Sequence, residues 1–342
     1  MAYPIIPKSQ ASSMDKVIAV IVTYNRQQLL SNCISALKNQ TRKIDTILVI
    51  NNGSTDGTLT WLKKQNDIDY ISQENVGSAG GFYTGIKTAY ERGYSWLWLM
   101  DDDGFPKEDA LEKLLEDDSE ELMLRNCAVI NKDDKKSFVW KTLNYKSVEE
   151  VKSKVIQNIA HPFNGTLLHR KIIERVGFPN PKLFLWGDET EYYYRIIKKN
   201  AIPFCTITDS IHYHPATSFS YKQEWDYKTA WKMYYYIRNR FHVHRSKFPA
   251  AVPFAYMMYT GFLIVFAFIT LAFQKTDKRK KLAFIFWPAK DALQNNFDAS
   301  PAYILEQLNT KRRHALITDI GIYSKMFKKF ICNLANANFK TI

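Results

Sequence analysis

The chain has 342 residues, 46% of them hydrophobic and 14% aromatic, which is enough to fill one large domain with an appendage, or two domains. The 13 glycines and 12 prolines exclude fibrous and low-complexity classes. The whole net charge of +13 lies after residue 225, because residues 1–225 are neutral. Such a basic block binds nucleic acid, binds an anionic membrane surface, or forms a solvated lysine-rich face.

Short apolar runs alternate with helical patterns over residues 1–120. Strands are predicted at 17–24, 46–51, 69–72 and 96–100, and helices at 26–40, 58–65 and 81–93. Asp56 stands where an N-cap would precede the second helix. This alternation predicts an α/β fold with a mostly parallel, Rossmann-like mixed sheet and helices on both faces. Ligands of such sheets gather at the carboxyl ends of the strands.

The pattern changes twice along the rest of the chain. Residues 121–225 mix short strands with hairpin-like segments, such as 127–140, whereas the chain from residue 225 onward is helical and aromatic. We therefore expect an α/β domain over residues 1–225, with halves of about 17–120 and 121–225. A basic helical region with an uncharged segment at 250–273 follows over 226–342.

The cysteines and the N-terminus both favour a cytosolic protein. Cys33, Cys127, Cys205 and Cys332 form no C-x-x-C pair, which predicts reduced thiols rather than a zinc site or a disulfide framework. The opening stretch MAYPIIPKSQASSMDK has neither a basic n-region nor an apolar h-region, so we expect no signal peptide.

Polar residues and glycines follow four consecutive predicted strands. They are the residues expected at one ligand crevice: Thr23, Asn25, Arg26, Asn52, Asp56, Gly77, Gly80, Gly81, Asp101, Asp102 and Asp103. The glycines lack G-x-G-x-x-G spacing and no P-loop is present, which argues against both of those nucleotide sites. Three adjacent carboxylates after a buried strand repel one another unless a cation lies there. A hard divalent ion, Mn²⁺ or Mg²⁺, shared with a diphosphate leaving group fits them.

Four stretches, VIVTYNR, NNGSTDGT, NVGSAGGF and WLWLMDDDG, taken in order, resemble the nucleotide-sugar half of glycosyltransferase family 2. The resemblance implies the GT-A fold, with Thr23 and Asn25 beside the nucleotide and Asn52 facing the base. It also implies that Asp101 and Asp103 are the outer acids of a metal-binding D-x-D motif, with Asp102 directed to the sugar or ribose.

A second stretch, LFLWGDETEYYYR, resembles the W-G-D-D-x-E-Y motif of galactofuranosyl- and rhamnosyltransferases. The resemblance implies a general base at Glu189, where Asp is commoner, with Asp188 as the alternative. A single carboxylate suffices to take the proton of an acceptor hydroxyl. Trp186 and Glu191 are expected on the acceptor side, Trp186 by stacking on a sugar face or as a core residue.

Two further segments extend the resemblance to residue 245. In SIHYHPATSF, a histidine completes the metal site of the resembling enzymes, which implies His214, with His212 as the alternative. An aromatic helix ending in Arg-Asn-Arg offers Arg238, and also Arg240, for contacts with a diphosphate or an acceptor phosphate.

The uncharged segment 250–273 is long enough to cross a bilayer and has basic residues at both ends, which favours a membrane partner over nucleic acid. Crossing would export the basic residues beyond 273, against their preference for the cytoplasm. Pro253 and Gly261 are also expected to interrupt the run. We therefore expect this segment to lie on the inner face of the cell membrane.

Together these features predict an inverting, metal-dependent glycosyltransferase, cytoplasmic and peripheral on the membrane. The expected donor is UDP-galactofuranose, with dTDP-rhamnose as the alternative, and the acceptor is a glycan on a polyprenyl-diphosphate lipid. The resemblance implies bacterial surface-polysaccharide synthesis, such as that of O-antigen, and leaves oligomerisation open. Two rivals remain: a nucleotidyltransferase, which TYNRQQLL matches poorly, and a non-catalytic membrane scaffold with the same fold.

Overall fold

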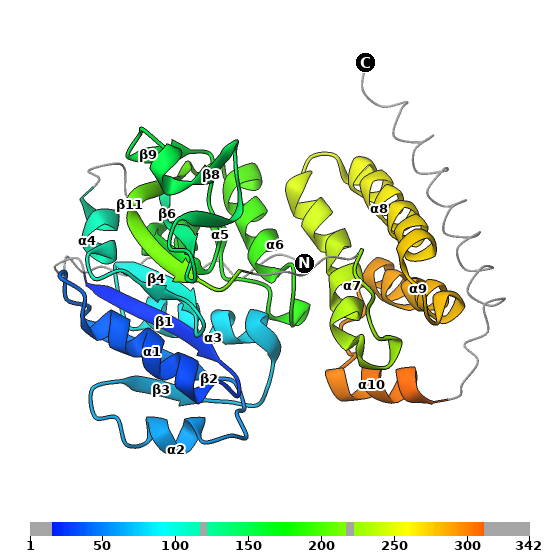
Figure 1. The fold of residues 1–342 in the computed structure, drawn as a ribbon, viewed down its shortest axis with the longest axis horizontal. Coiled ribbons are helices and arrows are strands. Elements are labelled where there is room, and N and C mark those ends of the chain that lie inside the picture. The colour runs from blue at the N-terminus through cyan, green and yellow to red at the C-terminus, as the bar shows by residue number, and fades with distance from the viewer. Residues whose placement is uncertain (1–15, 117–121, 217–221, 311–342) are drawn as a thin grey trace. The chain divides into compact units, whose positions relative to one another are not determined.

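The computed structural model describes residues 16–116, 122–216 and 222–310 (Figure 1). These residues form two compact units. The first unit comprises residues 16–184 and 188–216, and the second comprises residues 185–187 and 222–310. The predicted thiol at Cys332 lies outside the described residues, while Cys33, Cys127 and Cys205 are buried and form no disulfide with one another.

The first half of unit 1 is a four-stranded parallel sheet with intervening helices, as the sequence predicts. The strands lie in the order β3-β2-β1-β4. In chain order the elements are β1 (Val17–Thr23), α1 (Gln27–Lys38), β2 (Thr46–Asn51), α2 (Thr58–Leu62), β3 (Asp69–Ser72), α3 (Gly77–Glu91) and β4 (Trp96–Asp101).

The second half of unit 1 extends this sheet in the order β4-β10-β6-β11-β5. Strand β10 runs antiparallel to both of its neighbours, and β11 runs parallel to β6, so the sheet is mixed. Strands β6 and β7 form the predicted antiparallel pair. The elements are β5 (Phe105–Pro106), α4 (Ala110–Leu115), β6 (Leu124–Asn131), β7 (Ser137–Thr142), β8 (Tyr145–Ser147), η1 (Val148–Glu150), β9 (Val155–Gln157), β10 (Asn164–His169), α5 (Arg170–Val176), η2 (Pro181–Leu183), α6 (Asp188–Tyr194), η3 (Arg195–Lys199) and β11 (Phe204–His214).

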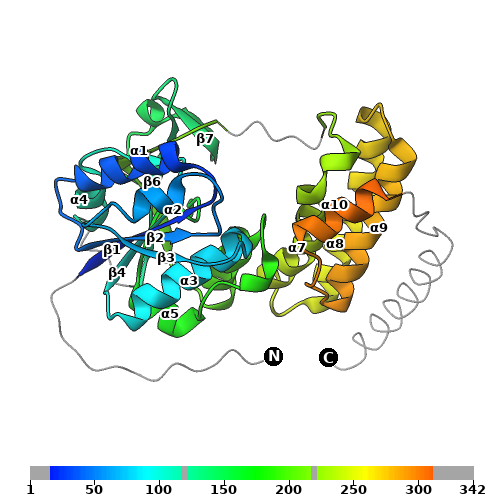
Figure 2. The same ribbon diagram turned by 90° about the horizontal axis from the view of Figure 1, so that it is seen from below.

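Alternate residues of the central strands feed two hydrophobic cores, one on each face of the sheet. Val17, Ala19 and Ile21 of β1 pack with residues of α1 and α4, whereas Ile18 and Val20 pack with residues of α3 and α5. This period of two is what a strand buried on both faces requires. Figure 2 shows α1 and α3 on opposite sides of the strands. The predicted layered fold is therefore confirmed.

Helix α3 begins at Gly77, four residues before its predicted start, so the glycines predicted as a turn lie in its first turns. A Cβ at Gly81 would overlap the side chain of Val22 on β1, and one at Gly80 would overlap Val76. The missing side chain at Gly81 therefore lets α3 lie close against the sheet. Sequence periodicity starts the helix too late because glycine carries no hydrophobic signal.

Unit 2 is helical throughout its described residues, as predicted. Its elements are η4 (Tyr227–Thr229), α7 (Trp231–Lys247), α8 (Val252–Phe273), α9 (Lys278–Gln294) and α10 (Pro301–Asn309). Helices α7, α8 and α9 share a small core of Phe241, Tyr259, Ala289 and Ala292. Lys281, in the first turn of α9, is fully buried and donates to Glu224 and Gln274 at 2.6 and 3.0 Å.

Helix α8 exposes a large apolar surface. Among the described residues it is the one helix long and apolar enough to span a membrane, and only 22% of its most apolar window is buried. Its exposed large side chains are Val252, Phe254, Met257, Met258, Ile264, Val265, Phe268, Leu271 and Phe273. The prediction that Pro253 and Gly261 interrupt the segment is wrong: Pro253 lies in the first turn, where its missing N–H costs nothing, and the helix continues past Gly261.

Candidate active site

The carboxyl ends of the parallel strands lie in register at one edge of the sheet. Thr23 on β1 pairs with Asn51 on β2, and Asn51 pairs with Ser72 on β3. On the other side of β1, Val22 pairs with Asp101 of β4. The polar residues that follow these strands are thereby brought to a single edge, as the sequence predicts.

Asp102 is turned inward from this edge. Its carboxylate is 3% exposed and accepts hydrogen bonds from Thr23 Oγ1 at 2.7 Å and from Arg26 Nη1 at 3.1 Å. Burial raises the pKa of Asp102 despite these two donors. Asp102 therefore links the ends of β1 and β4. Its predicted contact with the sugar or ribose stays a prediction.

Asp103 faces both Arg26 and His214. Arg26 Nη1 donates to Asp103 Oδ2 at 2.9 Å, and His214 Nε2 lies 3.4 Å from Asp103 Oδ1. Burial alone would raise the pKa of Asp103, but the interactions with His214 and Arg26 outweigh burial and lower it. Asp103 Oδ1 is buried and has no hydrogen-bond partner among the described residues.

The ring of His214 is held by a backbone carbonyl. Its Nδ1 lies 2.7 Å from the carbonyl oxygen of Pro215. Because a carbonyl can only accept, Nδ1 donates this hydrogen bond, and Nε2 is the ring atom that faces Asp103. The alternative, His212, packs against Gly104, and burial lowers its pKa to about 3, so this ring stays neutral in the core.

Asp101 shows the repulsion that the triple-acid motif predicts. Burial, followed by the charges of Asp103 and Asp102, raises its pKa well above the ordinary value, and Arg26 opposes this only in part. The negative charge of Glu189 adds to the effect, so α6 brings Glu189 toward the same acids. A cation at this edge would relieve the crowding.

A divalent cation fits the donor set at Asp103 and His214. Two ligand atoms that share such an ion at about 2.1 Å lie roughly 3 Å apart, close to the observed 3.4 Å. No cluster of three or more His, Cys, Asp or Glu side chains suited to a metal ion occurs in the described ranges. The site is therefore an open pair of protein ligands, which suits ions that also bind phosphate oxygens and water.

The two acids of the second motif differ in environment. Asp188 is buried and accepts a hydrogen bond from Ser78 Oγ at 3.0 Å. Burial, and next the charge of Glu189, raises its pKa well above the ordinary value. Glu189 is partly exposed, so of the two carboxylates it is the one that solvent reaches.

Glu191 does not stand at an accessible site, which corrects its predicted contact with the acceptor. Its carboxylate is 4% exposed and binds Arg195 through Nε at 3.1 Å and Nη2 at 3.2 Å. The same guanidinium donates to the carbonyls of Val176 and Phe178. Glu191 and Arg195 therefore form a buried structural pair.

The backbone leading to these acids is unusual, and the sequence gives no sign of it. Phe184 and Trp186 have positive φ angles of 65° and 58°, and Gly187 has 103°. The Phe184 carbonyl accepts from Ala79 N at 3.1 Å, and a Cβ at Gly77 would overlap that carbonyl. Such conformations persist only where the surrounding structure holds them, and they concentrate at functional sites.

The loops after β1 and β2 are tied together by Asn25. Asn25 has φ 54°, and its Oδ1 accepts from the backbone of Thr55 at 2.7 Å. Asp56 accepts from Thr58 N and from Gln27 N. The prediction that Asp56 is the N-cap of α2 is wrong by one residue, because Gly57 occupies that position. Asn25 and Asp56 are exposed beside these contacts, and their predicted role at the donor stays a prediction.

Asn52 holds the segment that leads into α3. Its Nδ2 donates to Gly77 O at 2.9 Å, and its Oδ1 accepts from Gln73 Nε2 at 3.0 Å and Val76 N at 3.3 Å. The side chain is 2% exposed. A hydrogen bond between Asn52 and a nucleotide base would therefore have to use an atom that already forms one of these hydrogen bonds.

Two predicted acceptor residues belong to unit 2. Trp186 is partly exposed and packs edge-on against Tyr236, while Asn239 Nδ2 donates to the carbonyls of Leu185 and Trp186 at 2.8 and 2.9 Å. Arg238 is fully buried over the rings of Tyr235 and others in α7. Its predicted phosphate contact is wrong, because the guanidinium serves the aromatic core.

Comparisons with known proteins agree with this geometry. Residues 18–177 match the sequence profile described as Glycosyl transferase family 2. The chain is 32% identical over 222 residues to galactofuranosyltransferase GlfT1 of Mycobacterium tuberculosis, covering 61% of this chain and 73% of that protein. It is 22% identical to the low-salt glycan biosynthesis hexosyltransferase Agl10 of Haloferax volcanii, covering 72% and 80%. The crystal structure of S. aureus TarS with UDP shares the fold, with a TM-score of 0.50, 12% identity, and coverage of 85% of this chain and 90% of that one.

Proposed function

The chain belongs to glycosyltransferase family 2 and is a GT-A-fold transferase, and from this premise we propose that it transfers galactofuranose from UDP-galactofuranose to a hydroxyl of a glycan. The observation that carries the proposal is the contact, at one sheet edge, between the acids after β4 and His214. The charge of Glu189, which raises the pKa of Asp101, supports the inclusion of Glu189 in the site. The similarity to GlfT1 supports the choice of donor, for which dTDP-rhamnose remains the alternative.

We assign Asp103 and His214, which lie together, as residues that would hold Mn²⁺ or Mg²⁺, and we propose Asp101 as a third ligand on the resemblance to the D-x-D motif. When bound, this ion would supply positive charge to the diphosphate leaving group. Arg26 already contacts Asp102 and Asp103 through one guanidinium nitrogen, so it orients both carboxylates. Thr23, Asn25 and Asp56, with the first turn of α3 at Gly77, would line the nucleotide.

Glu189 is our candidate general base. Inversion requires one group that removes the proton from the acceptor hydroxyl as the sugar is transferred. Glu189 is partly exposed at the edge of the acid cluster, whereas Asp188 is buried against Ser78. Asp188 then acts by positioning the start of α6, and Trp186 would contact the acceptor sugar.

The acceptor is proposed to be lipid-linked, with the enzyme peripheral on the cytoplasmic face of a bacterial membrane during surface-polysaccharide synthesis. The exposed apolar side chains of α8 would enter the headgroup region, and basic residues at 275 and 278–281 follow them. Residues 17–225 would then carry catalysis, with the donor half before residue 120, and residues 226–342 would provide attachment.

A panel of nucleotide sugars tests the proposal. The full chain is incubated with UDP-galactofuranose, UDP-galactopyranose and dTDP-rhamnose, with Mn²⁺, Mg²⁺ or EDTA, and release of the nucleoside diphosphate is measured. We expect release from UDP-galactofuranose that EDTA abolishes. Release of the nucleoside diphosphate from dTDP-rhamnose alone would show that dTDP-rhamnose, not UDP-galactofuranose, is the donor. If no donor releases it even when a lipid-linked glycan is present, a non-catalytic scaffold is favoured.

A further inference from the structure

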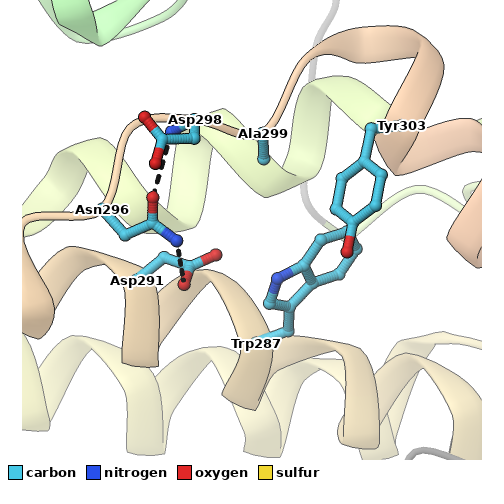
Figure 3. A pocket seen from close by; sticks show the side chains of 6 residues that line it. All are labelled: Trp287, Asp291, Asn296, Asp298, Ala299 and Tyr303. Atoms are coloured by element: carbon cyan, nitrogen blue, oxygen red, sulfur yellow. Dashed lines mark hydrogen bonds between the residues drawn. The ribbon is translucent and has the colours of Figure 1, made fainter.

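Unit 2 contains a pocket of about 270 Å³ between α9, the loop that follows it and α10 (Figure 3). It is lined by Trp287, Asp291, Asn296, Asp298, Ala299 and Tyr303. All of these residues lie in unit 2, and none belongs to the carboxylate site of unit 1.

One wall of the pocket is aromatic. The rings of Trp287 and Tyr303 lie edge-to-face, with centroids 6.0 Å apart and an interplanar angle of 80°. Trp287 is supported from behind by Tyr234 at 4.8 Å, while Tyr303 is 47% exposed. Large rigid rings at a surface offer apolar contact at small conformational cost.

The facing wall is polar and fixed in place (Figure 3). Asp291 accepts from Tyr234 OH at 2.5 Å and from Asn296 Nδ2 at 3.1 Å. Asn296 Oδ1 in turn accepts from Asp298 N at 3.1 Å. The Asp298 carboxylate is exposed at the rim, where it can accept hydrogen bonds from a ligand.

The two walls select one class of ligand. The lining contains two carboxylates and no Lys, Arg or His, so phosphates and other anions are disfavoured. The volume equals that of roughly nine water molecules at ~30 Å³ each, which is room for one sugar ring but not for a nucleotide. A sugar ring has an apolar C–H face for the aromatic wall and hydroxyl donors for the carboxylates.

We propose that this pocket is a second glycan-binding subsite, which holds one neutral sugar residue of the acceptor by stacking on Tyr303 and Trp287 and by hydrogen bonds to Asp298. The proposal rests on the proposed function in one respect, that the acceptor is a glycan. It assigns to unit 2 a part in acceptor recognition in addition to membrane attachment.

The test measures binding alone. The full chain, with EDTA and without nucleotide, is titrated with a β-galactofuranosyl disaccharide methyl glycoside, and binding is followed by saturation-transfer NMR. Tyr303→Ala and Asp298→Ala, both at exposed side chains, should each weaken binding about three- to tenfold. Glu306→Ala, which removes an exposed acid of α10 outside the pocket, should leave binding unchanged.

Absence of binding by the unmodified chain, or equal binding by all three variants, would overturn the subsite. The result is separate from the proposed function, because no donor or metal is present. If the chain binds the disaccharide at this pocket but releases no nucleoside diphosphate in the donor panel, the subsite proposal stands and the proposed reaction is wrong.

Discussion

At the scale of single residues, Ser78 offers a test of how Asp188 is held. Ser78→Ala removes a hydroxyl donor to Asp188 Oδ2 and should lower kcat about tenfold, since a hydrogen bond of this kind contributes on the order of 1.5 kcal/mol. The KM for the donor should not change. Ser78→Thr keeps the hydroxyl and should restore most of kcat. If the threonine variant is as slow as the alanine variant, the hydrogen bond from residue 78 to Asp188 does not determine kcat.

Glu189→Gln tests the general base. The amide keeps the shape of the side chain and removes its basicity, so transfer should fall by roughly 10²–10⁴-fold while the donor still binds. Asp188→Asn is the control, and both its affinity for the donor and its rate of sugar transfer are measured. If Asp188→Asn alone stops transfer with donor binding intact, the two roles are reversed.

Asp103→Ala tests the metal ligands. Loss of this carboxylate should abolish both turnover and the Mn²⁺-dependent part of UDP binding, measured by calorimetry with and without Mn²⁺. Asp109→Ala removes an acid that pairs with Lys107 at the start of α4 and should do neither. Equal UDP affinity with and without Mn²⁺ in the unmodified protein would rule the assignment out.

The sequence predicts the strand-end acids well but not the partners of the second motif. Glu191 lies four residues before Arg195, a spacing that favours an ion pair on one helix, and this signal pointed to the structural role. Arg238 follows three tyrosines, which indicated an aromatic environment. The contact of Ser78 with Asp188 spans 110 residues, and local pattern carries no information about it.

At the scale of elements, Lys281 holds the turn between α8 and α9. Lys281→Met should lower the free energy of unfolding by about 1–3 kcal/mol, because the buried oxygen of Gln274 loses its donor. Lys280→Met is the matched control, since the neighbouring lysine is exposed and pairs with Asp277 in the turn. Urea denaturation, followed by tryptophan fluorescence, measures the free energy of unfolding of each variant. Equal losses in the two variants would contradict the stabilising role of Lys281.

The same cluster predicts a pH dependence. Hydrogen bonds from Lys281 and then Thr276 lower the pKa of Glu224 from 4.5 to about 2. A depressed carboxyl pKa stabilises the fold fully above the unfolded value and loses that effect as the pH falls toward the folded value. The stability difference between the unmodified protein and Lys281→Met should therefore shrink between pH 4.5 and 2. A difference that is constant over this range would exclude the coupling.

The ends of helices and strands can be predicted from the sequence only where the side chains form a hydrophobic pattern. Strand β2 begins and ends where the alternation predicts, because its residues are apolar and β-branched. Helix α3 begins earlier than its hydrophobic period, because Gly80 and Gly81 are selected by contact with Val76 and Val22 rather than by helix propensity. Helix α8 continues through Gly261, since its length and apolarity outweigh one glycine.

At the scale of the whole molecule, the apolar surface of α8 predicts peripheral membrane binding. Phe268 and Val265 are 68% and 57% exposed, and changing both to Glu should weaken binding to anionic vesicles roughly tenfold or more. Tyr70→Glu, at an exposed apolar residue of β3, is the control for added charge. Vesicle sedimentation measures binding. If the double variant binds vesicles as well as the unmodified protein does, the membrane contact is not made by these residues of α8.

Topology is tested separately in intact cells. A cysteine introduced by Lys329→Cys, beyond the described residues, should be protected from a membrane-impermeant thiol reagent, because we expect the chain to stay on the cytoplasmic side. Labelling from outside would show that α8 crosses the membrane. High salt should release part of the protein, since basic residues contribute by electrostatic attraction.

The architecture of unit 1 follows from its sequence more fully than its site does. Alternating strands and helices fix the parallel half, because each buried strand needs helices on both faces. The sequence does not distinguish His212 from His214, whereas the register of β11 against β5 and β6 brings His214 Nε2 to 3.4 Å from Asp103 Oδ1.

The positive φ angles at Phe184, Trp186 and Gly187 also set an order of local unfolding. A backbone held in disfavoured conformations relaxes when its anchors open, so this segment should exchange its amide hydrogens before the strands of the sheet do. The start of α6, with its two carboxylates, would then be the part of unit 1 that a rise in temperature disorders first. Heat would therefore remove catalysis while the sheet is still folded, and the temperature at which activity is lost would lie below the melting temperature of the domain.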